Sequence, residues 1–308
     1  MNGSQSDYEK IVVSHYNNRE VQEEIVRFSQ NRWVALHCEF LNPQGYPVLL
    51  RYQRTTGKEK KPLRITNIEG VLTLLKRFER LRPRTFYASA NVYKELTLPE
   101  HVKSLDNIAF CLPTWDIDNA LGKWKATVAV AREIVSFLER VQVSKSVFLK
   151  WSGNGVHVHI HHRAFSTDLL RKINPLDAAY AIVGYVNIKL HSKYAEIAAK
   201  HGARELTVEN EMDLQRVFTC PLSLHRNLNL VAVCFSSNML DDFTPTWASL
   251  ERYRHLKEWD RFEEGEADNL AKEAYQTVGG YPLKTQSAAS EQKRKTTANV
   301  ITKWLERK

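Results

Sequence analysis

Two aspartates one position apart are the residues of this sequence best suited to chemistry. They are Asp116 and Asp118, in the run Trp115-Asp116-Ile117-Asp118. Successive side chains of an extended strand alternate between its faces, so both carboxylates project to one side. Because Asp116 ends an apolar strand, burying two like charges there is costly unless a cation lies between them. The pair therefore predicts a divalent metal site.

A second segment, Ser152-Gly153-Asn154-Gly155-Val156-His157, has the pattern of a strand, a tight turn and a second strand. Asn-Gly supplies the positive backbone φ angles that a two-residue hairpin turn requires. Backbone N–H groups of such a turn and the imidazole of His157 can converge on a phosphate. We expect this hairpin to bring a serine and a histidine close to the two carboxylates.

The histidines after this turn allow other interpretations. His157, His159 and His161 share one face of the second strand, and three histidines can bind zinc in a metallohydrolase. A strand face that merely happens to be rich in histidine is the plainer alternative. The position of His157 directly after the turn favours phosphate binding for that residue, and we assign no chemistry to the other two.

A third segment joins acidic residues to basic ones. Glu209-Asn210-Glu211-Met212-Asp213-Leu214-Gln215-Arg216 is followed by Pro221-Leu222-Ser223-Leu224-His225-Arg226. With this segment the chain resembles the archaeo-eukaryotic primase superfamily, whose pattern is D-x-D, then S-G-x-G-x-H, then an acidic stretch leading to an Arg and a Pro-x-Ser-Leu-His signature. The three matches occur in the expected order. Together they are specific, although each alone is not.

The resemblance implies template-directed nucleotidyl transfer by a primase or primase-polymerase, with NTP or dNTP as substrate and single-stranded or primed DNA as template. It implies that Asp116 and Asp118 hold two divalent ions, Mg²⁺ or Mn²⁺, which in such sites lie about 3.5–4 Å apart. No zinc site is expected. The residues implied to bind the incoming triphosphate are Ser152, Gly153, Asn154, Gly155, His157, Arg216, Ser223, His225 and Arg226. Arg216 has an alternative role, which is to brace the carboxylates.

The third metal carboxylate of the family has two candidates here. Counting back from His225 without gaps places Thr207 at its position, whereas a small gap brings Glu209 there, and Asp213 is the other choice. The chain also has Asn154 where replicative primase subunits usually have arginine, and Arg226 where the family has Gly-Lys after the histidine. A non-catalytic nucleic-acid-binding relative is therefore a second hypothesis, which loss of either aspartate would have favoured.

The charge of the chain suggests a polyanionic partner. The 308 residues carry a formal net charge of +9, and six Lys/Arg against one Glu fall between Arg51 and Arg64. We expect this run to follow template phosphates, and its cations are Arg51, Arg54, Lys58, Lys60, Lys61 and Arg64. The bland alternative is a solvated loop.

The rest of the sequence indicates a cytoplasmic protein with no membrane span. No run of eighteen apolar residues occurs, and the N-terminus has no apolar stretch. The four cysteines, at positions 38, 111, 220 and 234, show no C-x-x-C spacing, so we expect free thiols in a reducing compartment.

Mixed strand and helix patterns predict an α+β fold. Helices are expected over 18–30, 68–81, 123–141 and 174–202, and strands over 33–38, 46–53, 85–92, 108–118, 147–151, 156–161, 206–208 and 230–235. The resemblance implies an RRM-like sheet carrying the metal site, about 106–283, beside an N-terminal αβ unit, about 1–105. We expect residues 284–297 to form a linker and 298–308 a short helix that packs back on the domain or docks a partner protein.

Overall fold

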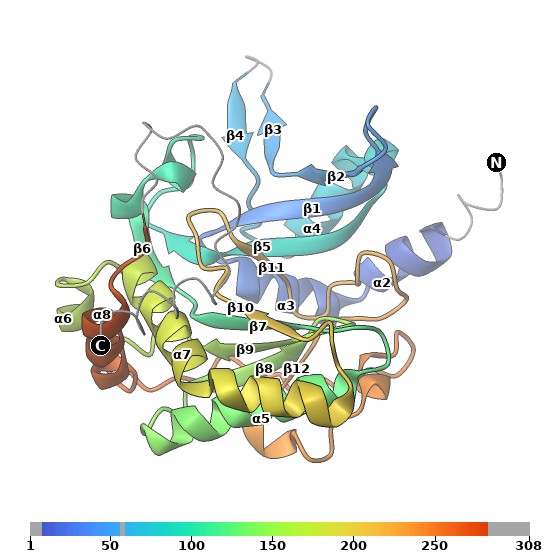
Figure 1. Ribbon diagram of the computed structural model, residues 1–308. Helices are drawn as coiled ribbons and strands as arrows, with labels where there is room; N and C mark the ends of the chain where they lie inside the picture. Colours follow the sequence, from blue (N-terminus) through green and yellow to red (C-terminus); the bar gives the residue numbers. More distant parts are fainter. Residues whose placement is uncertain (1–7, 56–58, 283–308) are drawn as a thin grey trace.

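The computed structural model describes residues 8–55 and 59–282. Two antiparallel sheets lie one above the other, and helices cover the lower sheet from below (Figure 1). The predicted α+β fold is confirmed. The expected linker and C-terminal helix, 284–308, lie outside the described residues. Within the described part of the chain, no helix is long and apolar enough to span a membrane.

The first sheet has the strand order β11-β5-β1-β2, and β6 also pairs with β5. Its strands are β1 (Arg32–Leu41), β2 (Pro47–Leu50), β5 (Pro83–Tyr93), β6 (Ile108–Cys111) and β11 (Val217–Thr219). A separate two-stranded ribbon, β3 (Tyr52–Arg54) and β4 (Lys60–Pro62), projects from it at the top of Figure 1. The sequence had indicated a loop where β11 lies, because three residues are too few to show a strand period.

The second sheet has the order β10-β7-β9-β8-β12. Its strands are β7 (Thr114–Asp118), β8 (Val147–Trp151), β9 (Val156–Ile160), β10 (Thr207–Glu209) and β12 (Val233–Phe235). The single strand expected over 108–118 is in fact two, β6 and β7, which belong to different sheets. Pro113 lies between them and has no N–H to continue a ladder, so the chain crosses from one sheet to the other there.

The helices follow the predicted periodicity closely. They are α2 (Ser14–Tyr16), α3 (Arg19–Ser29), α4 (Glu69–Arg77), α5 (Trp124–Arg140), α6 (Thr167–Leu170), α7 (Pro175–His201) and α8 (Asp268–Val278). Helix α7 has the expected ends, because the Asn174 side chain accepts from the Leu176 N–H and Gly202 has φ +56°. Helix α8, which the sequence did not lead us to expect, packs along α7.

Both faces of the second sheet are buried. Val156, Val158 and Ile160 of β9 are fully buried on the face that α5 covers, as their alternation predicts. The opposite face, with His157 and His159, lies under the first sheet, where both rings contact Phe218 of β11. All four cysteines are buried free thiols, as expected.

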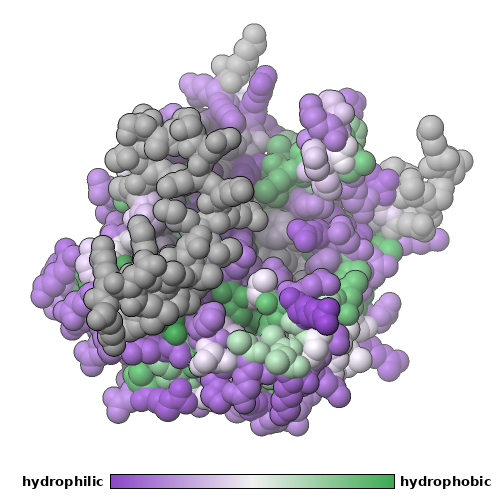
Figure 2. All heavy atoms as spheres, in the orientation of Figure 1, coloured by the Kyte–Doolittle hydropathy of each residue, from purple (hydrophilic) through white to green (hydrophobic). Residues whose placement is uncertain are grey.

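Hydrophilic residues cover most of the face shown in Figure 2, and hydrophobic residues form scattered patches on it. The most exposed large apolar side chains include Phe40, Leu41 and Tyr46 at the end of the β1–β2 hairpin, and Leu121 after β7.

Candidate active site

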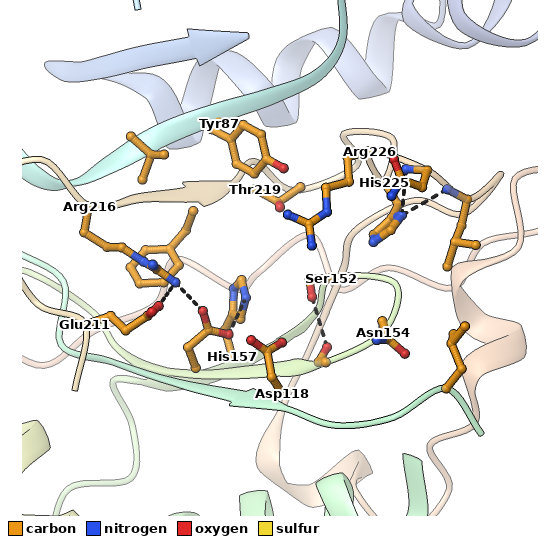
Figure 3. Close-up of a pocket in the computed structure, with 17 residues that line it drawn as sticks. Tyr87, Asp118, Ser152, Asn154, His157, Glu211, Arg216, Thr219, His225 and Arg226 are labelled. Carbon is orange, nitrogen blue, oxygen red and sulfur yellow. Dashed lines mark hydrogen bonds and ion pairs between the residues drawn. The ribbon is translucent and has the colours of Figure 1, made fainter. Parts of the chain in front are cut away.

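The two aspartates of β7 line a pocket of about 500 Å³ between the sheets. Figure 3 shows Asp118 in this pocket. Asp116 and Asp118 come from the lower sheet, and Tyr87, Phe218 and Thr219 from the upper one. Such a volume is within the range of small-molecule sites. The expected common direction of the two carboxylates is what the structure shows.

Asp116 is held by two neighbours. Its Oδ1 lies 3.2 Å from His157 Nε2, because Asp116 and His157 are directly opposite each other on β7 and β9. Its Oδ2 accepts from the Arg216 guanidinium, which also forms an ion pair with Glu211. His157 and Arg216 thus brace a carboxylate in this structure. For Arg216 this is the alternative role that the sequence left open, whereas the resemblance had implied phosphate binding for His157.

The carboxyl groups of the pair have opposite pKa shifts. Burial raises the pKa of Asp116, but the charges and hydrogen bonds of His157 and Arg216 outweigh burial and lower it to about 2. Burial, and then the charge of Asp116, raise the pKa of Asp118. The charges of His157, Arg216 and Arg226 act in the opposite direction, but no hydrogen bond or ion pair joins the Asp118 carboxylate to another described residue.

Neither candidate for the third carboxylate lines the pocket. Glu209 is opposite Asp116 in the β10–β7 pair but is exposed, and Asp213 Oδ1 instead accepts from the Gln215 N–H at 2.6 Å. Glu211 is the acidic residue of this segment that lines the pocket. Strand β10 ends at Glu209, so strand alternation does not determine the directions of Glu211 and Asp213.

The Ser-Gly turn lies at the other end of the pocket and fits there only because it has glycines. Gly153 has φ +115°, and a Cβ on it would lie 2.8 Å from Cδ2 of the His225 ring. A Cβ on Gly155 would lie 2.6 Å from the Ile117 carbonyl oxygen. The positive φ is at Gly153, not at Asn154 and Gly155 as the Asn-Gly pattern predicted. The turn therefore packs against both the aspartate strand and the third motif.

Polar groups at this end can donate hydrogen bonds. Nδ1 of His225 accepts from the N–H groups of Asn227 and Leu228, so Nε2 carries the proton. Burial, and then the charge of Arg226, lower the pKa of His225 to about 4. Arg226 is exposed, lines the pocket and points into it (Figure 3). Ser152 and Asn154 also line it.

Two residues near this end differ from expectation. Ser223 is fully buried and binds the Tyr16 hydroxyl at 3.0 Å and the Phe86 N–H at 2.8 Å, so it supports the fold behind the pocket. Arg84, which carried no sequence signal, donates to the carbonyls of His225 and Leu228 at 3.0 and 3.1 Å. It therefore holds the loop that presents His225 and Arg226.

The basic run of 51–64 lies mainly on the projecting ribbon. Arg54 and Lys60 are exposed on β3 and β4, Lys61 is partly exposed on β4, and Arg64 is exposed just beyond it. Arg51 differs, because it is half-buried, donates to the Gln215 carbonyl at 2.9 Å and lies over the Trp33 ring. Lys58 lies outside the described residues.

The donor types of the pocket fit a divalent cation. Mg²⁺ and Mn²⁺ prefer carboxylate oxygens, and Asp116, Asp118 and Glu211 supply them. Arg216 forms ion pairs with both Asp116 and Glu211 and compensates part of their charge. Over residues 8–55 and 59–282, no three His, Cys, Asp or Glu side chains are close enough together to form a metal site.

His159 binds Thr114 Oγ1 and His161 stacks on Phe262, so these two histidines have separate partners.

No protein-family model matches the chain, and no curated protein matches it. Among solved structures, the chain is similar to the polymerase domain of Mycobacterium tuberculosis Ligase D in complex with DNA, with a TM-score of 0.49 and 14% identity over 87% of this chain and 88% of that chain. It is also similar to the AEP domain of the cyanophage S-2L primase-polymerase, with a TM-score of 0.33 and 12% identity over 77% of this chain and 92% of that chain.

Proposed function

We propose that this chain is a metal-dependent nucleotidyltransferase of the primase-polymerase type. The observation that carries the proposal is the meeting of three separate motifs in one pocket, with carboxylates at one end and hydrogen-bond donors at the other. A nucleoside triphosphate and the divalent ions that accompany it need both kinds of group. Template-directed primer synthesis or extension is the reaction that we infer from this arrangement together with the sequence resemblance.

Asp116 and Asp118 form the metal end of the proposed site, with Glu211 as the nearest further carboxylate. Divalent ions held there would stabilise the charge on the attacking and leaving oxygens. His157 and Arg216 fix the direction of the Asp116 carboxylate, so this side chain is already oriented before a ligand binds. Arg216 must share or release Asp116 when a cation binds.

Arg226, the Nε2–H group of His225 and Ser152 form the triphosphate end. Because the pKa of His225 is lowered to about 4, its ring is neutral at pH 7 and donates one hydrogen bond from Nε2. Arg226 makes no ion pair with a described residue, so its guanidinium is available to phosphate oxygens. Arg84 keeps both residues in place through the loop carbonyls.

The two ends can be tested separately by calorimetry with Mn²⁺ and with a nucleoside triphosphate. We expect Asp118→Asn to weaken Mn²⁺ binding strongly, and Arg226→Gln to weaken triphosphate binding about tenfold while leaving Mn²⁺ binding unchanged. Arg252→Gln is the control, since Arg252 is exposed and does not line the pocket. Parental affinities in both pocket variants would contradict the proposal.

One observation favours a second candidate, the non-catalytic nucleic-acid binder. Arg216 already forms ion pairs with Asp116 and Glu211, so part of the negative charge of the three carboxylates is compensated without a metal. Under that alternative, nucleic acid binds with the same affinity with and without divalent ions, and no Mn²⁺ binding depends on Asp118. Calorimetry with Mn²⁺ on the parent and Asp118→Asn therefore distinguishes the two candidates.

A further inference from the structure

A second, smaller cleft lies where β9 ends, beyond the opposite end of that strand from the Ser-Gly turn. Its volume is about 190 Å³, which is room for about six water molecules at about 30 Å³ each. Its walls come from the junction of α3 and β1, from residues 161–163 after β9, and from the loop 259–262. None of these residues lines the first pocket.

The charge of this cleft is unbalanced toward cations. Arg27, Arg32 and Arg163 line it, and Asp260 is its only acidic lining residue among those the structure describes. Arg27 is compensated, because it forms ion pairs with Glu24 at 2.8 Å and with Asp260 at 3.6 Å. Arg32 and Arg163 are left to face the cleft without a carboxylate of their own.

Arg32 is the least expected of these cations, since it is only 3% exposed. Its guanidinium donates to the carbonyls of Ser89 and Ala90 at 2.6 and 2.7 Å, and to Nδ1 of His162 at 3.1 Å. These acceptors are neutral, and within the described part of the chain it has no carboxylate partner. An uncompensated buried charge is costly, so an anion that bound nearby would stabilise the fold.

The two histidines of the cleft also present donors. His161 Nδ1 accepts from the Arg163 N–H at 3.2 Å, and His162 Nδ1 accepts from Arg32. A backbone N–H and a guanidinium can only donate, so Nδ1 is unprotonated in both rings and Nε2 carries the proton. Neither Nε2 has a hydrogen-bond partner among the described residues. The cleft therefore gathers imidazole N–H and guanidinium donors with one competing carboxylate.

Burial and the same positive charges lower the pKa values of both histidines. Burial, and then the charges of Arg32 and Arg163, lower the pKa of His161 to about 3. Burial, followed by Arg32, lowers the pKa of His162 well below its usual value. Both rings are therefore neutral donors at pH 7, and the positive charge comes from the arginines.

We propose that this cleft binds a phosphate group, either as free phosphate or as part of a nucleic-acid backbone. Phosphate suits the donor set because several oxygens of one group can accept from the two imidazoles and the guanidinium of Arg163 at once. The inference does not rest on the proposed nucleotidyl transfer, since it uses other residues. Its failure would leave that proposal unaffected.

The test is a titration of the full chain, labelled with ¹⁵N-histidine, with inorganic phosphate, followed through the Nε2–H signals of His161 and His162. These signals report on this cleft even if phosphate also enters the first pocket. We expect saturable shifts of both signals in the parent. Arg163→Gln should weaken binding at least about tenfold, because a charge-assisted hydrogen bond is removed, and Asp260→Asn should tighten it.

Arg171→Gln is the matched control, because Arg171 is an exposed arginine outside the cleft and should leave the affinity unchanged. A second arm uses a short single-stranded oligonucleotide without terminal phosphates. Competition between oligonucleotide and phosphate at the two histidine signals identifies the nucleic-acid backbone as a source, and binding of phosphate alone identifies the free anion. Unshifted signals with both ligands, or equal affinity in the parent and Arg163→Gln, would overturn the inference.

Discussion

At the scale of single residues, the environment of each aspartate determines its role. Asp116 is only 8% exposed and has His157 and Arg216 as direct partners, whereas Asp118 has no hydrogen bond or ion pair with a described residue. The difference gives the two carboxyl groups opposite pKa shifts, a property that alternation along the strand could not predict. Asp116 is thus a fixed, ionised carboxylate, and Asp118 is the carboxyl group without a direct ion-pair partner.

Arg216 tests this view, because its ion pairs with Asp116 and Glu211 would compete with a metal bound at the proposed site. We expect Arg216→Gln to lower the free energy of unfolding by about 2–3 kcal/mol, less than for a fully buried pair because the Arg216 side chain is 27% exposed. Added Mn²⁺ should then raise the melting temperature of Arg216→Gln more than that of the parent.

The control is Arg132→Gln, which removes a surface ion pair with Asp241 and should cost less than about 1 kcal/mol. Thermal melts with and without Mn²⁺ measure both effects. Equal Mn²⁺ shifts in the parent and Arg216→Gln would show that the guanidinium and the metal do not compete.

The loss of folding stability at acidic pH should depend on Asp116. A carboxyl whose pKa falls from 3.8 to about 2 on folding stabilises the protein above the unfolded value, and this contribution is lost as pH falls from 3.8 through 2. Asp116→Asn should flatten the pH dependence of unfolding in that window. The raised pKa of Asp118 has the opposite sign, so Asp118→Asn should stabilise the metal-free protein at pH 7. Urea unfolding from pH 2 to 7 measures both, and unchanged profiles would contradict the assignment.

At the scale of elements, β7 and β9 hold the site together by register. Pairing places His157 opposite Asp116, and the turn that precedes β9 lies against Ile117 and His225. Gly153 and Gly155 are required because a Cβ would not fit at either position, and Gly153 also has a positive φ. The position of the turn therefore links the aspartate strand to the loop that carries Arg226.

Gly153→Ala should separate these two effects of glycine. Alanine at φ +115° is strained by about 1–2 kcal/mol, and its Cβ would also displace the His225 ring. Gly45→Ala is the matched control, since Gly45 has φ +80° and nothing within 4 Å of the added Cβ. Both variants should lose stability, measured by urea unfolding, with the larger loss in Gly153→Ala because of the added clash, but only Gly153→Ala should bind nucleoside triphosphate more weakly. Parental triphosphate affinity in Gly153→Ala would refute the packing of the turn on His225.

The sequence predicted the local features of these elements better than the contacts between them. Helix α7 was predicted with its caps, and the common face of Asp116 and Asp118 was predicted from the strand period. The pairing of β11 with β5, and with it the place of Phe218 over the histidines, depends on contacts distant in sequence. Glu211 and Arg84 were missed for the same reason, because each acquires its role only through a partner in another segment.

At the scale of the whole molecule, the pocket lies between two sheets and the basic ribbon projects from one of them (Figure 1). If the ribbon follows template phosphates, its cations contribute through counterion release. Arg54, Lys60 and Lys61 are suitable for this role, whereas Arg51 is engaged with Gln215 and Trp33.

Replacing Arg54, Lys60 and Lys61 together by Gln should reduce the salt dependence of single-stranded DNA binding. The slope of log K against log salt should fall by about 2, at about 0.7 for each phosphate that is no longer neutralised. The control replaces three exposed lysines of α7, Lys189, Lys193 and Lys200, and should leave the slope unchanged. Fluorescence anisotropy over a range of salt concentrations measures it. An unchanged slope in the ribbon variant would exclude the template role.

The central claim is that the pocket transfers nucleotides, and incorporation of labelled NTPs and dNTPs on primed and unprimed single-stranded templates, with Mg²⁺ or Mn²⁺, tests it most directly. The parent should incorporate label only with a divalent ion, and Asp116→Ala and Asp118→Ala should reduce incorporation by at least about a hundredfold. Asp241→Ala, which removes an exposed carboxylate outside the pocket, should retain parental activity. Incorporation that survives both pocket substitutions, or its absence from the parent under all these conditions, would contradict the claim.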